Sequence, residues 1–120
     1  MKVMVTAQGD GLDAVVDPRF GRARWLLVVD TATGAVEALD NSATAEAAHG
    51  AGNETARRAA AAGVAAVITG NVGPNAVRTL QAAGIPVYTV AGRVTVRDAL
   101  DALAAGTLPR AEGPTVVGWS

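Results

Sequence analysis

Residues 64–90 read VAAVITGNVGPNAVRTLQAAGIPVYTV and contain a strand, a helix and a second strand in succession. The run at 64–69 is short and apolar, which predicts a buried strand. Residues 74–83 predict a helix, because proline suits the first helical position and Gly84 suits the position after the last. Residues 85–90 predict the next strand. Such crossovers join parallel strands and are right-handed, so this unit predicts part of a parallel sheet.

The N-terminal part of the chain predicts the rest of this sheet. Residues 2–7 and 25–30 are apolar runs typical of strands. Residues 31–34 predict a hairpin turn that leads to a further strand at 35–40. The first, fourth and fifth strands should therefore be parallel, and the second and third should form an antiparallel edge.

Two more helices complete the prediction. Residues 53–62 are rich in helix formers. Thr95, followed three residues later by Asp98, resembles a capping box and predicts a last helix that Gly106 ends. Residues 42–52 are small, polar and contain glycine, and we expect them to be mobile.

The chain is expected to form one domain over residues 1–106, followed by an extended tail at 107–120. Its 120 residues are 50% hydrophobic and 18% charged, which is enough apolar material for one core. Within the tail, three apolar residues could dock on the surface of the domain: Val116, Val117 and Trp119.

Composition excludes several classes of protein. Ten basic residues stand against eleven acidic ones, and this balance argues against a nucleic-acid-binding face. The chain has no cysteine, which excludes disulfides and metal sites built from thiolates. No apolar run approaches the length of a membrane span. We therefore expect a soluble protein of the cytoplasm that binds neither nucleic acid nor membranes.

The topology places three loops at one edge of the sheet. Ligands of open α/β sheets bind beyond the carboxyl ends of the parallel strands, where the segments 8–13, 70–74 and 91–95 should meet. The turn at 50–52 begins a helix whose N-terminus could face the same side. Because helix N-termini attract anions, this edge is a candidate anion site.

Basic side chains lie close to the same edge. Arg19, Arg22 and Arg24 precede the second strand. Guanidinium groups can clamp anionic oxygen or sulfide, although the three arginines could equally be a solvated charged segment. His49 is the one histidine of the chain. Its imidazole could ligate a metal or hydrogen-bond an anion, or it could be a solvated loop residue.

Catalytic chemistry has weaker support in the sequence. Asp10, Asp13 and Asp17 could hold Mg²⁺, but aspartates in such contexts are also common turn residues. The segment 70–75 is glycine-rich like a phosphate-binding loop, yet it has no P-loop lysine, which argues against ATP hydrolysis. The serines do not fit a nucleophile elbow, and we assign no catalytic residue.

Four blocks of sequence, in order, are distinctive together: GDGLD at 9–13, DPRFGR at 17–22, GAG at 50–52 and TGNVGPNA at 69–76. With them, residues 1–106 resemble the dinitrogenase iron–molybdenum cofactor biosynthesis family. The resemblance implies a ribonuclease H-like fold. This fold is a five-stranded mixed α/β sheet in the order 3-2-1-4-5, with strand 2 antiparallel and three helices.

The same resemblance implies binding rather than turnover. It implies a non-catalytic carrier for an iron–sulfur or molybdenum–sulfur cluster, or its precursor, with a cofactor-assembly protein as a possible partner. His49 would be a metal ligand, and Arg19 and Arg22 would clamp the anion. The remaining cofactor-binding residues implied are Gly50, Gly52, Gly70, Asn71 and Gly73.

This sequence departs from the carrier pattern at two places. Carriers often have a histidine where Arg19 stands, and some have a cysteine in the loop that matches 70–73. Both differences remove soft ligands for iron. Two alternatives remain: a regulatory module that binds a small anion or a partner protein, and, by analogy of fold alone, a Mg²⁺-dependent nuclease-like enzyme.

Overall fold

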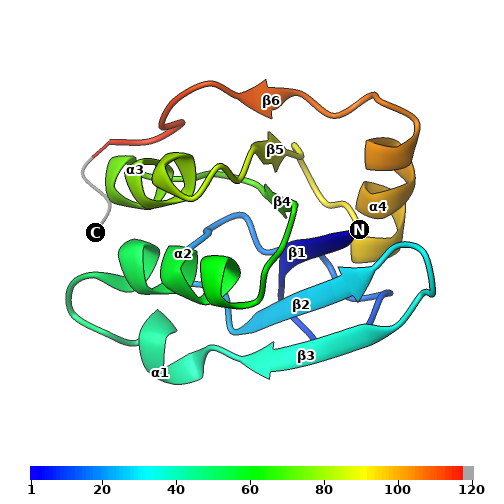
Figure 1. Cartoon of the computed structure of the whole chain (residues 1–120). Coiled ribbons are helices and arrows are strands. Elements are labelled where there is room, and N and C mark those ends of the chain that lie inside the picture. Colours follow the sequence, from blue (N-terminus) through cyan, green and yellow to red (C-terminus); the bar gives the residue numbers. More distant parts are fainter. Residues whose placement is uncertain (118–120) are drawn as a thin grey trace.

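A single mixed sheet organises residues 1–117, which are the residues that this computed structural model describes. The strand order is β3-β2-β1-β4-β5-β6 (Figure 1). The strands are β1 (Lys2–Ala7), β2 (Trp25–Asp30), β3 (Val36–Asp40), β4 (Ala66–Thr69), β5 (Val87–Thr89) and β6 (Arg110–Ala111). The helices are α1 (Ser42–Ala45), α2 (Ala51–Ala61), α3 (Pro74–Ala82) and α4 (Val96–Ala104).

The pairing of the first five strands confirms the predicted topology. β1 pairs with β2, and β2 with β3, in antiparallel orientation. β1, β4 and β5 are parallel, with Val5 opposite Ile68 and Ile68 opposite Tyr88. The order 3-2-1-4-5 of a ribonuclease H-like sheet is thus present.

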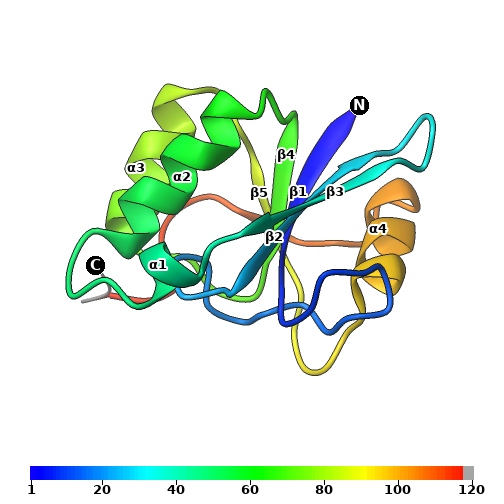
Figure 2. The same ribbon diagram turned by 90° about the horizontal axis from the view of Figure 1, so that it is seen from below.

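Helices cover both faces of the sheet. Side chains alternate between the two faces along each strand, so the apolar strands present side chains on both faces that need to be buried. Met4 of β1 packs in the core that α2 and α3 complete, whereas its neighbours Val3 and Val5 pack in the core that α4 completes. Figure 2 shows α2 and α3 on one side of the sheet and α4 on the other. None of the helices in residues 1–117 is long and apolar enough to cross a membrane.

The segment expected to be mobile is partly helical. Residues 42–45 form α1, and the preceding Asn41 is buried. Its amide nitrogen donates to the Ala23 carbonyl at 2.9 Å, and its side-chain oxygen accepts from Arg58 at 2.9 Å. These contacts fix the start of the segment, and a pattern based on small and polar residues does not reveal them.

The C-terminal tail adds a sixth strand to the five that were predicted. Arg110–Ala111 form β6 and pair antiparallel with β5, with Ala111 opposite Val87. The Thr89 N–H also donates to the Pro109 carbonyl at 3.0 Å. A strand of two residues has no readable periodicity, and it forms because the outer edge of β5 offers unpaired backbone groups. Of the residues expected to dock, Val117 is 84% exposed and does not dock on the domain, and Trp119 lies outside the described part of the chain.

Candidate functional site

The loops after β1, β4 and β5 meet at the carboxyl edge of the sheet, but the loop after β1 bonds to the other two through residues 16–20 and not through the predicted 8–13. The segment after β1 reaches the loop after β5, where the Val16 N–H donates to the Val94 carbonyl at 2.8 Å. It then reaches residues 70–73, here called the glycine loop. The Asn71 N–H donates to the Pro18 carbonyl at 2.7 Å, and the Phe20 N–H donates to the Asn71 carbonyl at 3.1 Å. Two backbone bonds therefore hold the glycine loop against residues 18–20.

Two glycines make this close packing possible. A Cβ atom on Gly21 would lie 2.5 Å from the backbone nitrogen of Gly52, in the first turn of α2. A Cβ atom on Gly70 would lie 2.5 Å from the Cα atom of Pro18. At both positions the neighbouring group is backbone, so any side chain would push the segments apart.

Two of the helices that begin at this edge, α2 and α3, lack side-chain caps. α2 starts after Gly50, which has a φ of 78°, and α3 starts after Gly73; neither receives a hydrogen bond from a capping side chain. α4 by contrast is capped as predicted, since the Thr95 hydroxyl accepts from the Asp98 N–H at 3.1 Å. The first N–H groups of α2 and α3 therefore have no capping side chain as acceptor.

The two uncapped ends lie side by side. α2 and α3 pack against each other on one face of the sheet (Figure 2). A Cβ atom on Gly52 would lie 3.4 Å from Cβ of Ala76, so the first turns of the two helices are in contact. Their partial positive charges therefore add at one place, which favours an anion there.

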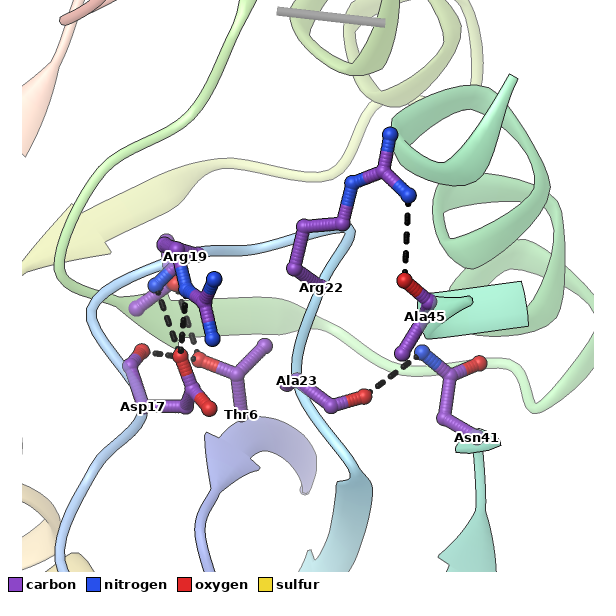
Figure 3. Close-up of polar contacts among 8 residues, drawn as sticks. Thr6, Asp17, Arg19, Arg22, Ala23, Asn41 and Ala45 are labelled. Atoms are coloured by element: carbon purple, nitrogen blue, oxygen red, sulfur yellow. Dashed lines mark hydrogen bonds and ion pairs between the residues drawn. The ribbon is translucent and has the colours of Figure 1, made fainter. Parts of the chain in front are cut away.

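Asp17 is part of the framework of the edge. It is 5% exposed, and its carboxylate accepts the Arg19 N–H at 2.9 Å (Figure 3). The Thr6 hydroxyl lies 2.9 Å from the Asp17 carbonyl oxygen and 2.8 Å from the Thr69 hydroxyl. This is the turn role that the sequence left open for Asp17, and it fixes the backbone leading to Arg19.

The three aspartates proposed for Mg²⁺ are not brought together. Asp13 is exposed and accepts from the Arg97 guanidinium at 3.0 Å, which lowers the pKa of this carboxyl below its usual value. Asp10 is exposed, whereas Asp17 is buried beside Arg19. Within residues 1–117, no group of three histidine or acidic side chains is placed to hold a metal ion.

The two arginines expected to clamp an anion have different surroundings. Arg22 donates to the carbonyls of Ala45, at 3.0 Å, and Ala47, and so ties its segment to the end of α1 (Figure 3). The Arg19 side chain is 57% exposed, and its Nε lies 3.8 Å from the Asp17 carboxylate. Arg19 therefore keeps donors that a ligand can reach.

His49 precedes the first residue of α2 by two positions and is exposed. It makes no hydrogen bond or ion pair with another described residue. The structure thus places the imidazole near the N-terminal end of α2, in reach of solvent.

A pocket of about 390 Å³ opens beside the glycine loop. Its lining residues are Val16, Pro18, Gly70, Asn71, Thr89, Val90, Ala91, Gly92 and Thr115. The chain passes from β4 to α3 on one face of the sheet and from β5 to α4 on the other face. The pocket lies between these two connections, in the kind of crevice at which open α/β sheets bind ligands. The sequence indicated this edge, but it gave no sign that Thr115 from the tail lines the pocket.

Comparison with known families agrees with this architecture. A family model described as dinitrogenase iron-molybdenum cofactor matches residues 1–106. The chain belongs to this family. A search of curated proteins finds no match.

Solved structures place the family fold on most of the chain. The apo form of the orange protein from Desulfovibrio gigas is 47% identical, with a TM-score of 0.92 and 96% of each chain covered. A NifB-like protein from Thermotoga is 38% identical, with a TM-score of 0.77 over 89% of this chain and 90% of that one. A dinitrogenase-like protein from Methanocaldococcus jannaschii is 17% identical with a TM-score of 0.71, covering 95% and 97%, and shows likeness of fold alone.

Proposed function

We propose that this protein is a non-catalytic carrier that binds a metal–sulfur cluster, or its precursor, during the assembly of a metallocofactor. The cluster is cargo, taken up from and passed to assembly proteins. The observation that carries the proposal is the contact between two uncapped helix N-termini, at Gly50–Gly52 and at Gly73, beside the accessible Arg19. Family membership supports it, as does the similarity to the orange protein, whose structure is that of an apo form.

The chemistry of the site suits an anionic cluster held mainly by hydrogen bonds. Iron–sulfur and molybdenum–sulfur clusters carry sulfide or oxo groups that accept hydrogen bonds from backbone N–H groups. In this proposal the backbone donors come from Gly50, Gly52, Gly70 and Gly73, and Asn71 contributes its side-chain amide, because its own N–H is bonded to Pro18. Arg19 adds charge-assisted bonds, and Arg22 supports them from the neighbouring segment.

His49 is the metal ligand of the proposal. The chain has no cysteine, so a neutral imidazole is the softest ligand near the edge. Its exposure allows the ring to turn toward a cluster without breaking an existing contact. A site with one such ligand releases its cargo more readily than one with several thiolates, which suits a carrier.

Anaerobic reconstitution with iron, sulfide and molybdate tests this function. We expect the wild-type protein to acquire visible absorption and bound metal, and we expect His49→Ala and Arg19→Ala to retain less of both. Lys2→Ala is the matched control, because it removes one positive charge at the opposite end of β1. A protein that stays colourless and metal-free under all these conditions would refute the carrier function.

A second function, a module that binds a small anion without metal, draws on the same uncapped helices. It is favoured by the lack of a three-ligand metal group in residues 1–117. Calorimetric titration with molybdate or phosphate alone distinguishes the anion-binding module from the cluster carrier. Tight binding of the plain anion with no gain of iron or sulfide would favour the module over the carrier.

A further inference from the structure

The C-terminal segment crosses the glycine loop and bonds to it through Thr115. The Thr115 N–H donates to the Val72 carbonyl at 2.9 Å, and the Val72 N–H donates to the Thr115 hydroxyl oxygen at 2.9 Å. A residue 43 positions away in sequence thus satisfies both backbone groups of Val72. The segment, drawn in red in Figure 1, runs from β6 back past α3.

The single proton of the Thr115 hydroxyl has two acceptors within reach. These are the side-chain oxygen of Asn71, at 3.3 Å, and the carbonyl of Val72, at 3.4 Å. The Val72 carbonyl already accepts the Thr115 N–H at 2.9 Å. The Asn71 side-chain oxygen has no other donor among residues 1–117, so we expect the Thr115 hydroxyl to donate its proton to Asn71 and not to Val72.

This bond holds the oxygen end of the Asn71 carboxamide toward Thr115. The backbone of Asn71 is held on both sides by its bonds to Pro18 and Phe20, which leaves rotation of the carboxamide as its main freedom. With its oxygen turned to Thr115, the amino group has two N–H donors that no other described residue accepts. Asn71 lines the pocket, and its amino group is the end of the carboxamide that is turned away from the Thr115 hydroxyl.

Among residues 1–117, the pocket has no charged side chain in its lining, so its polar groups decide which ligands it accepts. Its polar side chains are those of Asn71, Thr89 and Thr115. An amide that presents N–H₂ favours an anion, whereas the flipped amide would present an oxygen and repel one. The orientation of the Asn71 carboxamide therefore influences whether the glycine loop accepts an anionic ligand.

We propose that Thr115 is a positioning residue that orients Asn71 to donate to the anionic cargo of the glycine loop. This proposal rests on the proposed carrier function and adds a residue of the tail to it. Thr115 acts through Asn71 and does not itself need to touch the cargo.

The test is a double-mutant cycle on cargo affinity, measured by anaerobic titration with iron, sulfide and molybdate. Thr115→Val keeps the shape of the side chain and the Thr115 N–H bond. It removes the hydroxyl, and with it both the bond to Asn71 and the acceptor of the Val72 N–H. We expect affinity to fall about five- to tenfold, as loss of one hydrogen bond predicts. Thr115→Ser restores the hydroxyl and should restore affinity. Thr107→Val is the control, because that hydroxyl bonds only to Ala102, at the end of α4.

Coupling to Asn71 separates positioning from a general structural role. In an Asn71→Ala background, Thr115→Val should cause no further loss of affinity. Equal binding by wild type and Thr115→Val, or an equal loss in both backgrounds, would overturn the proposal while leaving the carrier function intact. A wild-type protein that takes up no metal would overturn the carrier function and this proposal together.

Discussion

The contact between Gly21 and Gly52 leads to a sharp prediction about the variant Gly21→Ala. The new methyl group would lie 2.5 Å from the Gly52 nitrogen and 2.7 Å from its Cα atom. Atoms in ordinary contact are about 3.5–4 Å apart, so the two backbones must separate by about 1 Å. Both partners are main chain, and one of them begins a helix, so neither can turn aside as a flexible side chain would.

The expected cost follows from this overlap. Forcing one methylene into a packed interior typically costs about 1–3 kcal/mol, and backbone against backbone places Gly21→Ala near the upper value. With a urea dependence of about 2 kcal/mol/M, the midpoint of unfolding should fall by roughly 1–1.5 M. Gly70→Ala, which would place its Cβ 2.5 Å from Pro18, should behave alike.

Urea unfolding followed by circular dichroism provides the assay. Gly11→Ala is the matched control, because nothing lies within 4 Å of a Cβ atom there, and its midpoint should stay close to that of the wild type. A midpoint for Gly21→Ala within about 0.2 M of the wild type would show that the segment does not need this close approach.

Three further predictions concern a helix cap, a surface carboxylate and the core. Thr95→Ala removes the hydroxyl that accepts from Asp98 and should destabilise the protein by about 1 kcal/mol in urea unfolding. The hydrogen bonds from Ser42 lower the pKa of the Asp40 carboxyl below the ordinary 3.8, and Asp40→Asn removes its charge. The wild type should therefore be more stable than this variant at neutral pH, and the difference in stability should disappear as the pH falls below that value. Phe20→Ala empties a site that is 1% exposed and should cost about 3–5 kcal/mol in the same assay.

Each of these predictions has an outcome that contradicts it. For the cap, Thr95→Ser should retain most of the stability, and equal loss in the serine and alanine variants would exclude a role for the hydroxyl. For Asp40, the carboxylate gains stability only in its ionised form, so an advantage that grows on acidification would be of the wrong sign. For Phe20, a loss below about 1 kcal/mol would mean that the loop before β2 is not packed into the core.

The sheet could be predicted because its strands are marked strongly. Short apolar runs bounded by glycine and proline fixed the parallel strands, and the turn at 31–34 fixed the antiparallel edge. The start of α2 was missed by two residues, because Gly50 and Gly52 are poor helix formers on local propensity. That turn is helical because it packs against Gly21, a contact between residues 31 positions apart along the chain.

The candidate site was predictable in place but not in detail. Topology alone brings the loops after the parallel strands to one edge, so the glycine loop and Arg19 could be expected there. The bonds from Arg22 to α1 and from Thr115 to Val72 depend on tertiary packing, and no spacing in the sequence encodes them. The role of His49 stays a prediction until metal binding is measured.

The bond between Val72 and Thr115 has a consequence for the timing of biosynthesis. Chains emerge from the ribosome N-terminus first, at about 5–20 residues per second, and domains begin to fold as they appear. The strands β1 to β5 can pair before residue 115 has been added, but the glycine loop receives its last partner only then. A nascent chain would therefore hold the sheet before the site is finished, and the glycine loop would reach its full affinity for cargo only after synthesis has passed Thr115.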